Sequence, residues 1–197
     1  MSVENIFGLQ NKHRSERYVE YDWIVSKLTW PSSILDVGAM DGAGTIEFFW
    51  DWLKKHGYDD YTTLDLIEEA RGYKTDIVAD IRDSGIESDS YDYVICISTL
   101  EHIEDPRKAV DEMIRIAERK VLITIPYGKA QKHSWGIQYD ENLLKQLMKD
   151  ITYEADLFVY HQDHGWMRGV EEMLKNRGYA TGGAPYAAGV ACIEVKL

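Results

Sequence analysis

The sequence predicts an α/β protein with a mostly parallel, seven-stranded sheet and helices on both faces. Short apolar runs typical of buried strands alternate with segments whose apolar residues recur at helical spacing. The run "YDYVICIS" (91–98) is almost entirely apolar, as expected of a central parallel strand. Strands separated by helices in this way form parallel sheets that are covered on both sides.

Seven apolar runs are predicted as strands, and five segments as helices. The strands are expected at 33–38, 61–66, 75–80, 91–98, 120–126, 153–162 and 189–197. The helices are expected at 15–28 with Ser15 as a cap, at 45–56 before Gly57, after Asp105-Pro106, after Asp140, and near 168–177. Capping residues at the helix starts and glycines after the ends support these positions.

Composition limits the classes of protein that the chain fits. Its 197 residues are 45% hydrophobic, enough for one ordinary domain with a sizeable core. The formal charge of −12 disfavours a nucleic-acid partner. Cys96 and Cys192 both lie in apolar runs, which favours reduced core cysteines over a disulfide. No segment has the apolar length of a signal core or membrane span, so a soluble, cytoplasmic protein without a membrane partner is expected.

Glycines follow the first predicted strand in the stretch "ILDVGAMDGAGT" (34–45). Gly38, Gly42 and Gly44 allow positive φ angles and a close approach of the backbone to a ligand. The Lys-Ser/Thr ending of a phosphate-binding loop is absent, and the spacing G-x-x-x-G-x-G differs from the dinucleotide pattern. The loop is typical of a cofactor site, although glycines that serve only to pack a tight turn remain the alternative.

Acidic residues stand at or near the ends of three successive predicted strands, at Asp36, Asp65 and Asp80. An acid about 20 residues past the glycines suits the two hydroxyls of a ribose, so Asp65 fits NAD and other adenosine cofactors alike. A carboxylate at Asp80 can accept a hydrogen bond from an adenine amino group. Each acid alone could be a helix cap or a loop residue, but the three together favour an adenosine cofactor.

The fourth strand runs into "STLEHIEDP" (98–106), and this element makes the pattern specific. The order "ILDVGAMDGAGT", "LDL", "VADIRD", "STLEHIEDP" resembles a class I S-adenosylmethionine-dependent methyltransferase, of the type that O-methylates small molecules and sugars. The resemblance covers roughly residues 33–128, including "VLITIPYG" as the fifth strand and its loop. It implies a Rossmann-like fold with S-adenosylmethionine as the cofactor.

The resemblance also assigns cofactor contacts. The glycine loop would pack on the methionyl part, Asp65 would hold the ribose, Asp80 and Ile81 would bind the adenine, and Ser98 and Thr99 would lie near the sulfonium. The complete set of expected cofactor-binding residues is Asp36, Gly38, Ala39, Met40, Gly42, Asp65, Leu66, Asp80, Ile81, Ser98 and Thr99.

Two features of the resemblance leave alternatives open. Met40 stands where the family usually has glycine, so its side chain either occupies space beside the cofactor or points away from it. An N-terminal helix often covers the cofactor or acceptor in this family. Residues 1–30 are therefore expected to be a helical lid segment on a methyltransferase domain over 31–197, although a helix packed on the sheet flank fits the same pattern.

Transfer of a methyl group to a hydroxyl needs a positioned acceptor and a base, and histidine suits that task near neutral pH. The candidate catalytic residues are His102, His133, His161, Asp163 and His164. His102 follows the fourth strand but could serve only to order the loop, as could Glu101. The others lie in polar loops after the fifth and sixth strands, for which a solvated loop is the alternative.

The composition of these two loops predicts the chemical class of the acceptor. Trp135, Tyr139, Tyr160 and Trp166 offer flat aromatic faces beside His and Asp, which suits a sugar or another small hydroxylated molecule. His161, Asp163 and His164 could form a metal site. Some sugar O-methyltransferases of the family that the chain resembles hold magnesium with acids at the ends of the fourth and fifth strands. No acid ends the fifth strand at 125–127, so no essential metal is expected. An NAD-linked oxidoreductase on a similar fold, and a non-catalytic member that binds a cofactor or a partner chain, are the two alternatives.

Overall fold

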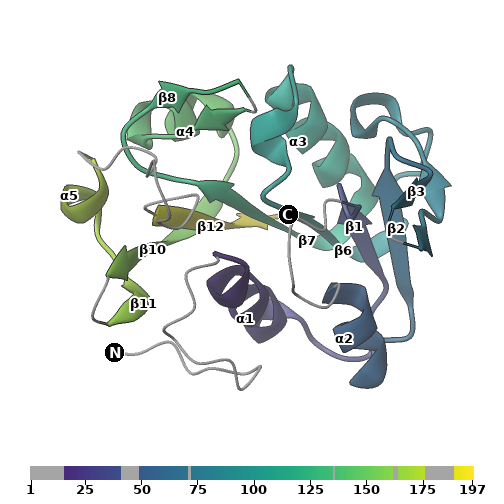
Figure 1. Cartoon of the computed structure of the whole chain (residues 1–197). Coiled ribbons are helices and arrows are strands. Elements are labelled where there is room, and N and C mark those ends of the chain that lie inside the picture. Colours follow the sequence, from purple (N-terminus) through teal and green to yellow (C-terminus); the bar gives the residue numbers. More distant parts are fainter. Residues whose placement is uncertain (1–15, 41–48, 71, 135, 162–163, 176–188) are drawn as a thin grey trace.

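The computed structural model describes residues 16–40, 49–70, 72–134, 136–161, 164–175 and 189–197 (Figure 1). One eight-stranded sheet spans the molecule in the order β11-β10-β12-β7-β6-β1-β2-β5. Its strands are β1 (Ile34–Val37), β2 (Tyr61–Asp65), β5 (Ile77–Val78), β6 (Tyr91–Ile97), β7 (Ala117–Pro126), β10 (Tyr153–His161), β11 (Gly165–Arg168) and β12 (Gly189–Lys196). Two small hairpins stand apart, β3 (Glu69–Ala70) with β4 (Tyr73–Lys74) and β8 (Gln131–Lys132) with β9 (Ile137–Gln138).

The sheet is parallel on one side and antiparallel on the other. Strands β5, β2, β1, β6 and β7 are parallel neighbours, so their carboxyl ends share one edge. Strand β12 runs antiparallel to both β7 and β10, which places the end of β10 at that same edge. Chain order reverses beside β1, which neighbours β2 on one side and β6 on the other, and such a reversal is where α/β sheets bind ligands.

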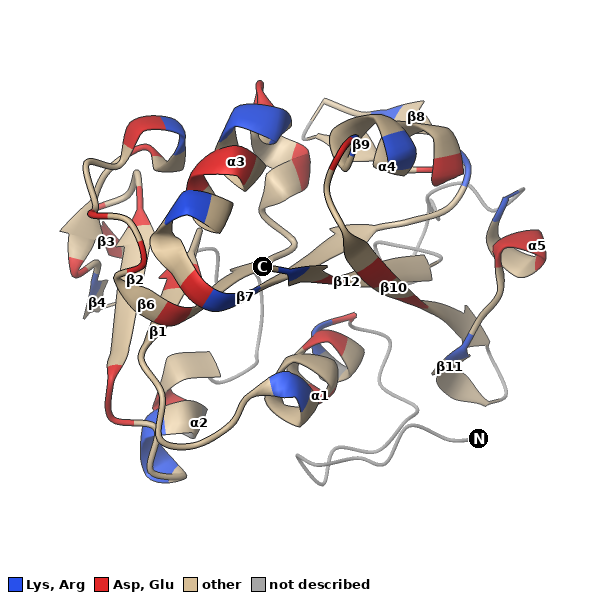
Figure 2. Ribbon diagram, turned by 180° about the vertical axis from the view of Figure 1, so that it is seen from behind, with Lys and Arg blue, Asp and Glu red and all other residues tan. Residues whose placement is uncertain are grey.

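Helices cover both faces of the sheet, as predicted (Figure 1). The helices are α1 (Arg17–Lys27), α2 (Phe49–Lys55), α3 (Pro106–Ile116), α4 (Glu141–Leu147) and α5 (Glu171–Leu174), with 3-10 turns η1 (Ile81–Asp83) and η2 (Leu100–His102). Helices α1 and α2 lie on one face, and α3 and α4 lie on the other (Figure 2). Each pair encloses its own apolar cluster against the sheet, and burial of these two clusters holds the layers together.

The capping prediction holds for the helices after strands β6 and β9. Asp105 accepts a hydrogen bond from Lys108 N at 3.3 Å, with Pro106 in the first helical position. Asp140 accepts one from Leu143 N at 2.9 Å. Ser15, the cap predicted for the first helix, lies outside the described residues.

The predicted strand number was wrong, because a short strand after β10 was not foreseen. Gly165 has φ +72° and turns the chain back, so that β11 pairs with β10 in an antiparallel hairpin. Trp166 stands opposite Tyr160, with ring centroids 5.7 Å apart in an edge-to-face arrangement that stabilises the pair. The helix predicted near 168–177 therefore starts later, at Glu171, since Arg168 belongs to β11.

Helix α1 packs directly on the sheet and is held there by polar contacts as well as apolar ones. Trp23 Nε1 donates to Asp156 Oδ2 of β10 at 2.9 Å. Lys27 Nζ lies 2.8 Å from Glu194 Oε2 of β12. These contacts join α1 to the antiparallel side of the sheet, so the flank-packing alternative describes α1, and a covering role for residues 1–30 stays a prediction.

Candidate active site

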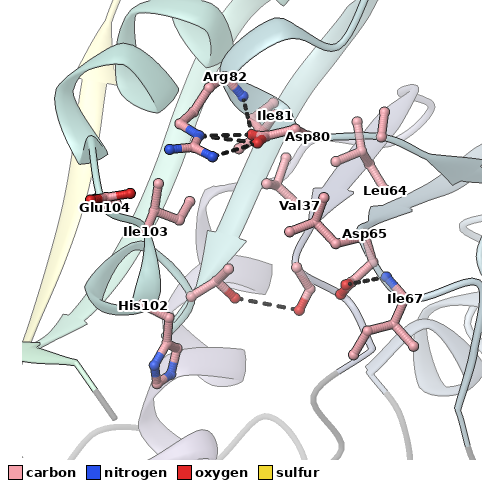
Figure 3. Close-up of a pocket in the computed structure, with 14 residues that line it drawn as sticks. Val37, Leu64, Asp65, Ile67, Asp80, Ile81, Arg82, His102, Ile103 and Glu104 are labelled. Carbon is pink, nitrogen blue, oxygen red and sulfur yellow. Dashed lines mark hydrogen bonds and ion pairs between the residues drawn. The ribbon is translucent and has the colours of Figure 1, made fainter. Parts of the chain in front are cut away.

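A cavity of about 380 Å³ opens at the carboxyl ends of β1, β2 and β6, between η1 and η2 (Figure 3). Its volume falls within the range of about 300–1,000 Å³ typical of small-molecule sites. The lining residues come from the ends of strands and from the turns that follow them. They are Val37, Gly38, Leu64, Asp65, Leu66, Ile67, Ala79, Asp80, Ile81, Arg82, Thr99, His102, Ile103 and Glu104.

Gly38 brings the backbone of the β1 loop against Thr99 at the floor of this cavity. Its φ is +76°, and a Cβ placed on it would lie 2.1 Å from Thr99 Cγ2 and 2.7 Å from Thr99 Cβ. Thr99 Oγ1 donates to Gly38 O at 3.3 Å and to Ile97 O at 3.2 Å. Only glycine fits this position, so the loop passes close to the end of β6 and leaves space above it.

Asp65 ties the glycine loop to the turn after β2. Its Oδ2 accepts a hydrogen bond from Met40 N at 2.9 Å, and its Oδ1 accepts one from Ile67 N at 3.0 Å. A carboxylate has about four lone-pair sites, so both oxygens keep capacity for a further donor. Asp65 lines the cavity and can therefore receive a pair of ligand hydroxyls, as the ribose prediction requires.

Apolar side chains form the walls beside Asp65. Leu66 is 70% exposed and Ile67 is 50% exposed, which is unusual for large aliphatic side chains in contiguous positions. Ile81 lies buried at the wall that η1 forms. Two exposed aliphatic side chains next to a polar anchor suit a flat apolar ring such as a purine.

Asp80 is engaged by its own neighbour in the chain. Arg82 donates to Asp80 Oδ2 through Nη2 at 2.7 Å and to Oδ1 through Nε at 3.0 Å (Figure 3). Arg82 N also donates to Oδ1, at 2.9 Å. The side-chain hydrogen bonds, followed by the backbone one, lower the pKa of Asp80 to about 2, so this carboxyl is ionised at the cavity wall.

Ser98 turns away from the cavity toward helix α1. Its φ is +42°, and its buried hydroxyl donates to Glu20 Oε1. The same oxygen accepts a hydrogen bond from Thr124 Oγ1 at 2.9 Å, while Glu20 Oε2 lies 3.0 Å from Arg17 Nη1. The fully buried Glu20 carboxylate thus joins α1 to the carboxyl ends of β6 and β7. This contact fixes the backbone that leads into Thr99.

Asp36 lies beneath the glycine loop and accepts a hydrogen bond from the Tyr61 hydroxyl. Burial raises the pKa of Asp36 to about 7, although the Tyr61 hydrogen bond opposes this effect. Asp36 joins β1 to β2 from inside the sheet and is not among the residues that line the cavity. The predicted bracing role fits this position.

Met40 lies in the apolar cluster under α1 and α2, where it is 2% exposed. It is not among the residues that line the cavity; its backbone N–H is the part that reaches Asp65. Ala39 is half-buried and packs against the same cluster. Gly42, which was also predicted to bind the cofactor, lies outside the described residues.

His102 and Glu101 form a polar pair at the end of β6. The His102 side chain is 41% exposed and lines the cavity, and its Nε2 lies 3.9 Å from Glu101 Oε1. Glu101 is 5% exposed, and its Oε2 has no hydrogen-bond partner among the described residues. Burial raises the pKa of Glu101 to about 8, so this carboxyl can bind or release a proton near neutral pH.

The hairpin after β7 lies against this pair. A Cβ on Gly136 would fall 2.6 Å from Glu101 O and 3.2 Å from His102 Nδ1. His133 N donates to Gly136 O at 2.8 Å within the hairpin. The structure therefore brings the loop of His133 next to His102, two candidate catalytic residues that are 31 positions apart in the sequence.

His161 and His164 stand further along the same edge of the sheet. Their rings stack with centroids 4.8 Å apart in the β10–β11 turn. Strand β10 is three strands from β6, which is about 15 Å at the usual strand spacing. They are not among the residues that line the cavity, and Asp163 and Trp135 lie outside the described residues.

Sequence reasoning did not single out Arg82, Glu104, Arg17 and Glu20. The signal for Arg82 was its place two residues after Asp80 in "DIRD", within reach of that carboxylate. Glu20 carried no such signal, because its partners lie 78 and 104 positions away. Within the described residues, no group of three or more His, Cys, Asp or Glu side chains is arranged to hold a metal ion.

Comparison with known proteins identifies the kind of domain that forms the cavity. A family model described as "Methyltransferase domain" matches residues 35–125. Residues 35–125 therefore carry a methyltransferase domain. The matched range runs from β1 to the end of β7 and so includes every residue that lines the cavity. No curated protein matches the sequence.

Solved structures share the methyltransferase fold at low sequence identity. An S-adenosylmethionine-dependent methyltransferase from Thermotoga maritima has a TM-score of 0.57 and 15% identity, over 92% of this chain and 89% of that one. Magnesium protoporphyrin IX methyltransferase from Synechocystis, with bound S-adenosylmethionine, has a TM-score of 0.55 and 15% identity, over 90% of this chain and 76% of that one. A 1,6-didemethyltoxoflavin-N1-methyltransferase from Burkholderia thailandensis has a TM-score of 0.55 and 13% identity, over 84% of this chain and 71% of that one.

The residues of the cavity fit S-adenosylmethionine. Asp65 has spare acceptor capacity for the ribose hydroxyls, Leu66, Ile67 and Ile81 offer apolar walls for the adenine, and Gly38 leaves room where a side chain would stand. S-Adenosylmethionine is accordingly the cofactor of the methyltransferase domain. Helices that could cross a membrane are not found in the described part of the chain.

Proposed function

We propose that the chain transfers the methyl group of S-adenosylmethionine to a hydroxyl of a small polar acceptor, such as a sugar or glycan. The observation that carries this proposal is the His102–Glu101 pair beside the cofactor cavity. A hydroxyl must lose its proton when it is methylated, so O-methylation needs a base close to the transferred group. Histidine and a carboxyl whose pKa is raised to about 8 are suited to that step near neutral pH.

The chain's residues act mainly by holding and orienting the reactants. Bound S-adenosylmethionine supplies an electrophilic methyl group. Asp65 holds the ribose, Gly38 and Thr99 shape the floor, and His102 takes the proton of the acceptor hydroxyl. Glu101 lies beside His102 and becomes negatively charged as the pH approaches about 8, where it stabilises the positive charge that forms on His102. Placement of the acceptor accounts for much of the rate, as in other reactions between two bound molecules.

The polar acceptor is supported by the side chains along the edge of the sheet. His133 lies in the hairpin next to His102, and Tyr160, Trp166 and the two stacked histidines follow along that edge. Aromatic faces next to imidazoles suit hydroxylated rings. The solved relatives named for a porphyrin and for a toxoflavin precursor have very different substrates, so the fold alone does not select the acceptor.

A labelled-methyl assay tests the proposal. Purified protein is incubated with S-adenosylmethionine carrying a radioactive methyl group and with a panel of sugars, phenols, amines and peptides. Label is expected in hydroxyl acceptors. His102→Gln should lower kcat about 100-fold or more, as loss of a general base does, whereas His56→Gln at the end of α2 should leave kcat unchanged.

Two results would contradict the proposal in different ways. Label found only in amines or at carbon would retain the methyltransferase and exclude O-methylation. Binding of S-adenosylhomocysteine without label in any acceptor would favour the non-catalytic alternative.

A further inference from the structure

The ligand group predicted to bind Asp80 would compete with the hydrogen bonds that Asp80 accepts from Arg82 in the structure. The prediction gives it the amino group of adenine as a donor. In the structure its Oδ1 already accepts from Arg82 N and Nε, and its Oδ2 accepts from Arg82 Nε and Nη2. Three N–H groups of Arg82 make these contacts, and the guanidinium fork (Nε and Nη2) takes the outer edge of the carboxylate. A ligand donor that needs this edge must therefore displace the guanidinium.

The Arg82 side chain is the part of this arrangement that can move. The backbone hydrogen bond from Arg82 N is fixed by the η1 turn, in which Asp80 is the cap. The guanidinium and the carboxylate are 33% and 35% exposed, so water competes for both. An exposed ion pair of this kind is weak and is exchanged readily.

A second acid lines the cavity together with Arg82. It is Glu104, which follows η2 and is drawn on the same side of the cavity as Arg82 in Figure 3. The pKa of Arg82 is raised first by the hydrogen bonds and charge of Asp80, and further by the charges of Glu104 and Asp105. Asp105 is engaged as the cap of α3, which leaves Glu104 as the acid that lines the cavity.

We propose that Arg82 exchanges Asp80 for Glu104 when the cofactor binds, and thereby sets the preference of the site for adenine. The adenine amino group takes the place of the guanidinium on Asp80 Oδ2. Arg82 then pairs with Glu104, with its planar guanidinium over the purine ring, a geometry that arginine favours. Hypoxanthine has a carbonyl acceptor where adenine has the amino group, and its ring N1–H stands at the neighbouring ring position. It therefore offers no donor at the place of the amino group and leaves Arg82 on Asp80. The proposal concerns the cofactor alone and does not depend on the acceptor.

Calorimetry with two ligands tests the exchange. The ligands are S-adenosylhomocysteine and S-inosylhomocysteine, in which a carbonyl replaces the amino group. The wild-type protein is expected to bind the inosine compound at least about tenfold more weakly, because a site that pairs with a donor rejects a ligand that lacks it. Equal affinities would show that Asp80 does not bind the amino group and would overturn the proposal.

Three variants and a control locate the effect. Glu104→Gln should weaken S-adenosylhomocysteine about threefold to fivefold, the range of an exposed ion pair, because the displaced guanidinium then has no acid to pair with. Arg82→Ala removes both the competitor for Asp80 and the partner of Glu104, and should not weaken the ligand. The double variant should lose no more than Arg82→Ala alone, since the two side chains then act as one pair. Asp83→Asn removes the same charge next to Arg82 but does not line the cavity, and should bind as the wild type does.

The outcome separates an exchange from a static Asp80–Arg82 pair. If Glu104→Gln binds S-adenosylhomocysteine like the wild type, or if it causes the same loss in the Arg82→Ala background, Arg82 does not pair with Glu104 and the proposal is wrong. The three positions changed, 82, 83 and 104, lie on the surface or at the rim of the cavity, and an unchanged thermal midpoint confirms that each variant folds.

Discussion

Replacement of Gly38 by alanine tests how closely the glycine loop must approach strand β6. The new Cβ would lie 2.1 to 2.7 Å from three atoms of the Thr99 side chain, and the residue would keep a φ of +76°. A non-glycine residue in the left-handed region costs about 1–2 kcal/mol. Overpacking a filled site costs about 1–3 kcal/mol more. The unfolding free energy should therefore fall by about 2–5 kcal/mol, a large part of an ordinary domain's stability.

Urea unfolding of Gly38→Ala measures this loss, and the chain offers a matched control. Gly57 also has a positive φ, +91°, but a Cβ there would meet no atom within 4 Å. Gly57→Ala should therefore show the backbone cost alone, about 1–2 kcal/mol. Thr99→Ala in the Gly38→Ala background removes the Cγ2 and Oγ1 contacts and should recover part of the packing cost. If Gly38→Ala destabilises the protein no more than Gly57→Ala does, the close approach is not real.

Three further predictions concern the cofactor loop and the buried acids. Asp65→Ala should weaken S-adenosylhomocysteine at least about tenfold in calorimetry while the protein stays folded, because the ribose hydroxyls lose a charged acceptor; unchanged affinity would refute the ribose assignment. Met40→Gly should lower the unfolding free energy by about 3 kcal/mol or more, with little change in cofactor affinity, because the side chain fills the core under α2; tighter binding would instead mean that it crowds the site. The pKa of Glu101 is raised to about 8, so the native state holds a proton that the unfolded chain has lost. This contribution is complete below about pH 4.5 and is lost as the pH rises toward about 8. The unfolding free energy should accordingly fall over this range, and Glu101→Gln should reduce that slope; an unchanged slope would contradict the shift.

The sequence predicted which residues converge, because topology alone decides that. Gly38, Asp65, Asp80 and Thr99 follow strands that run parallel in one sheet, and the carboxyl ends of such strands meet at one edge. Their place in the cavity follows from the order of elements without any side-chain detail. His102 was located by the same argument.

The sequence did not predict which way each side chain points or which groups it contacts. Ser98 follows β6 like Thr99, but its hydroxyl is drawn to Glu20 of α1, which packs there only in the folded chain. Asp80 lines the cavity as predicted, but the sequence did not show that its carboxylate accepts hydrogen bonds from the nearby Arg82 side chain. Strand β11 was missed because its four residues gain stability from pairing with β10 and show little local strand preference.

Titration of the purified protein with S-adenosylhomocysteine, and separately with NAD, tests the central claim most directly. The account predicts that S-adenosylhomocysteine binds at one site per chain, that Asp65→Ala loses this binding, and that NAD produces no heat of binding and no rise in the thermal midpoint. Stabilisation by NAD, with none by S-adenosylhomocysteine, would contradict the assignment of the cavity.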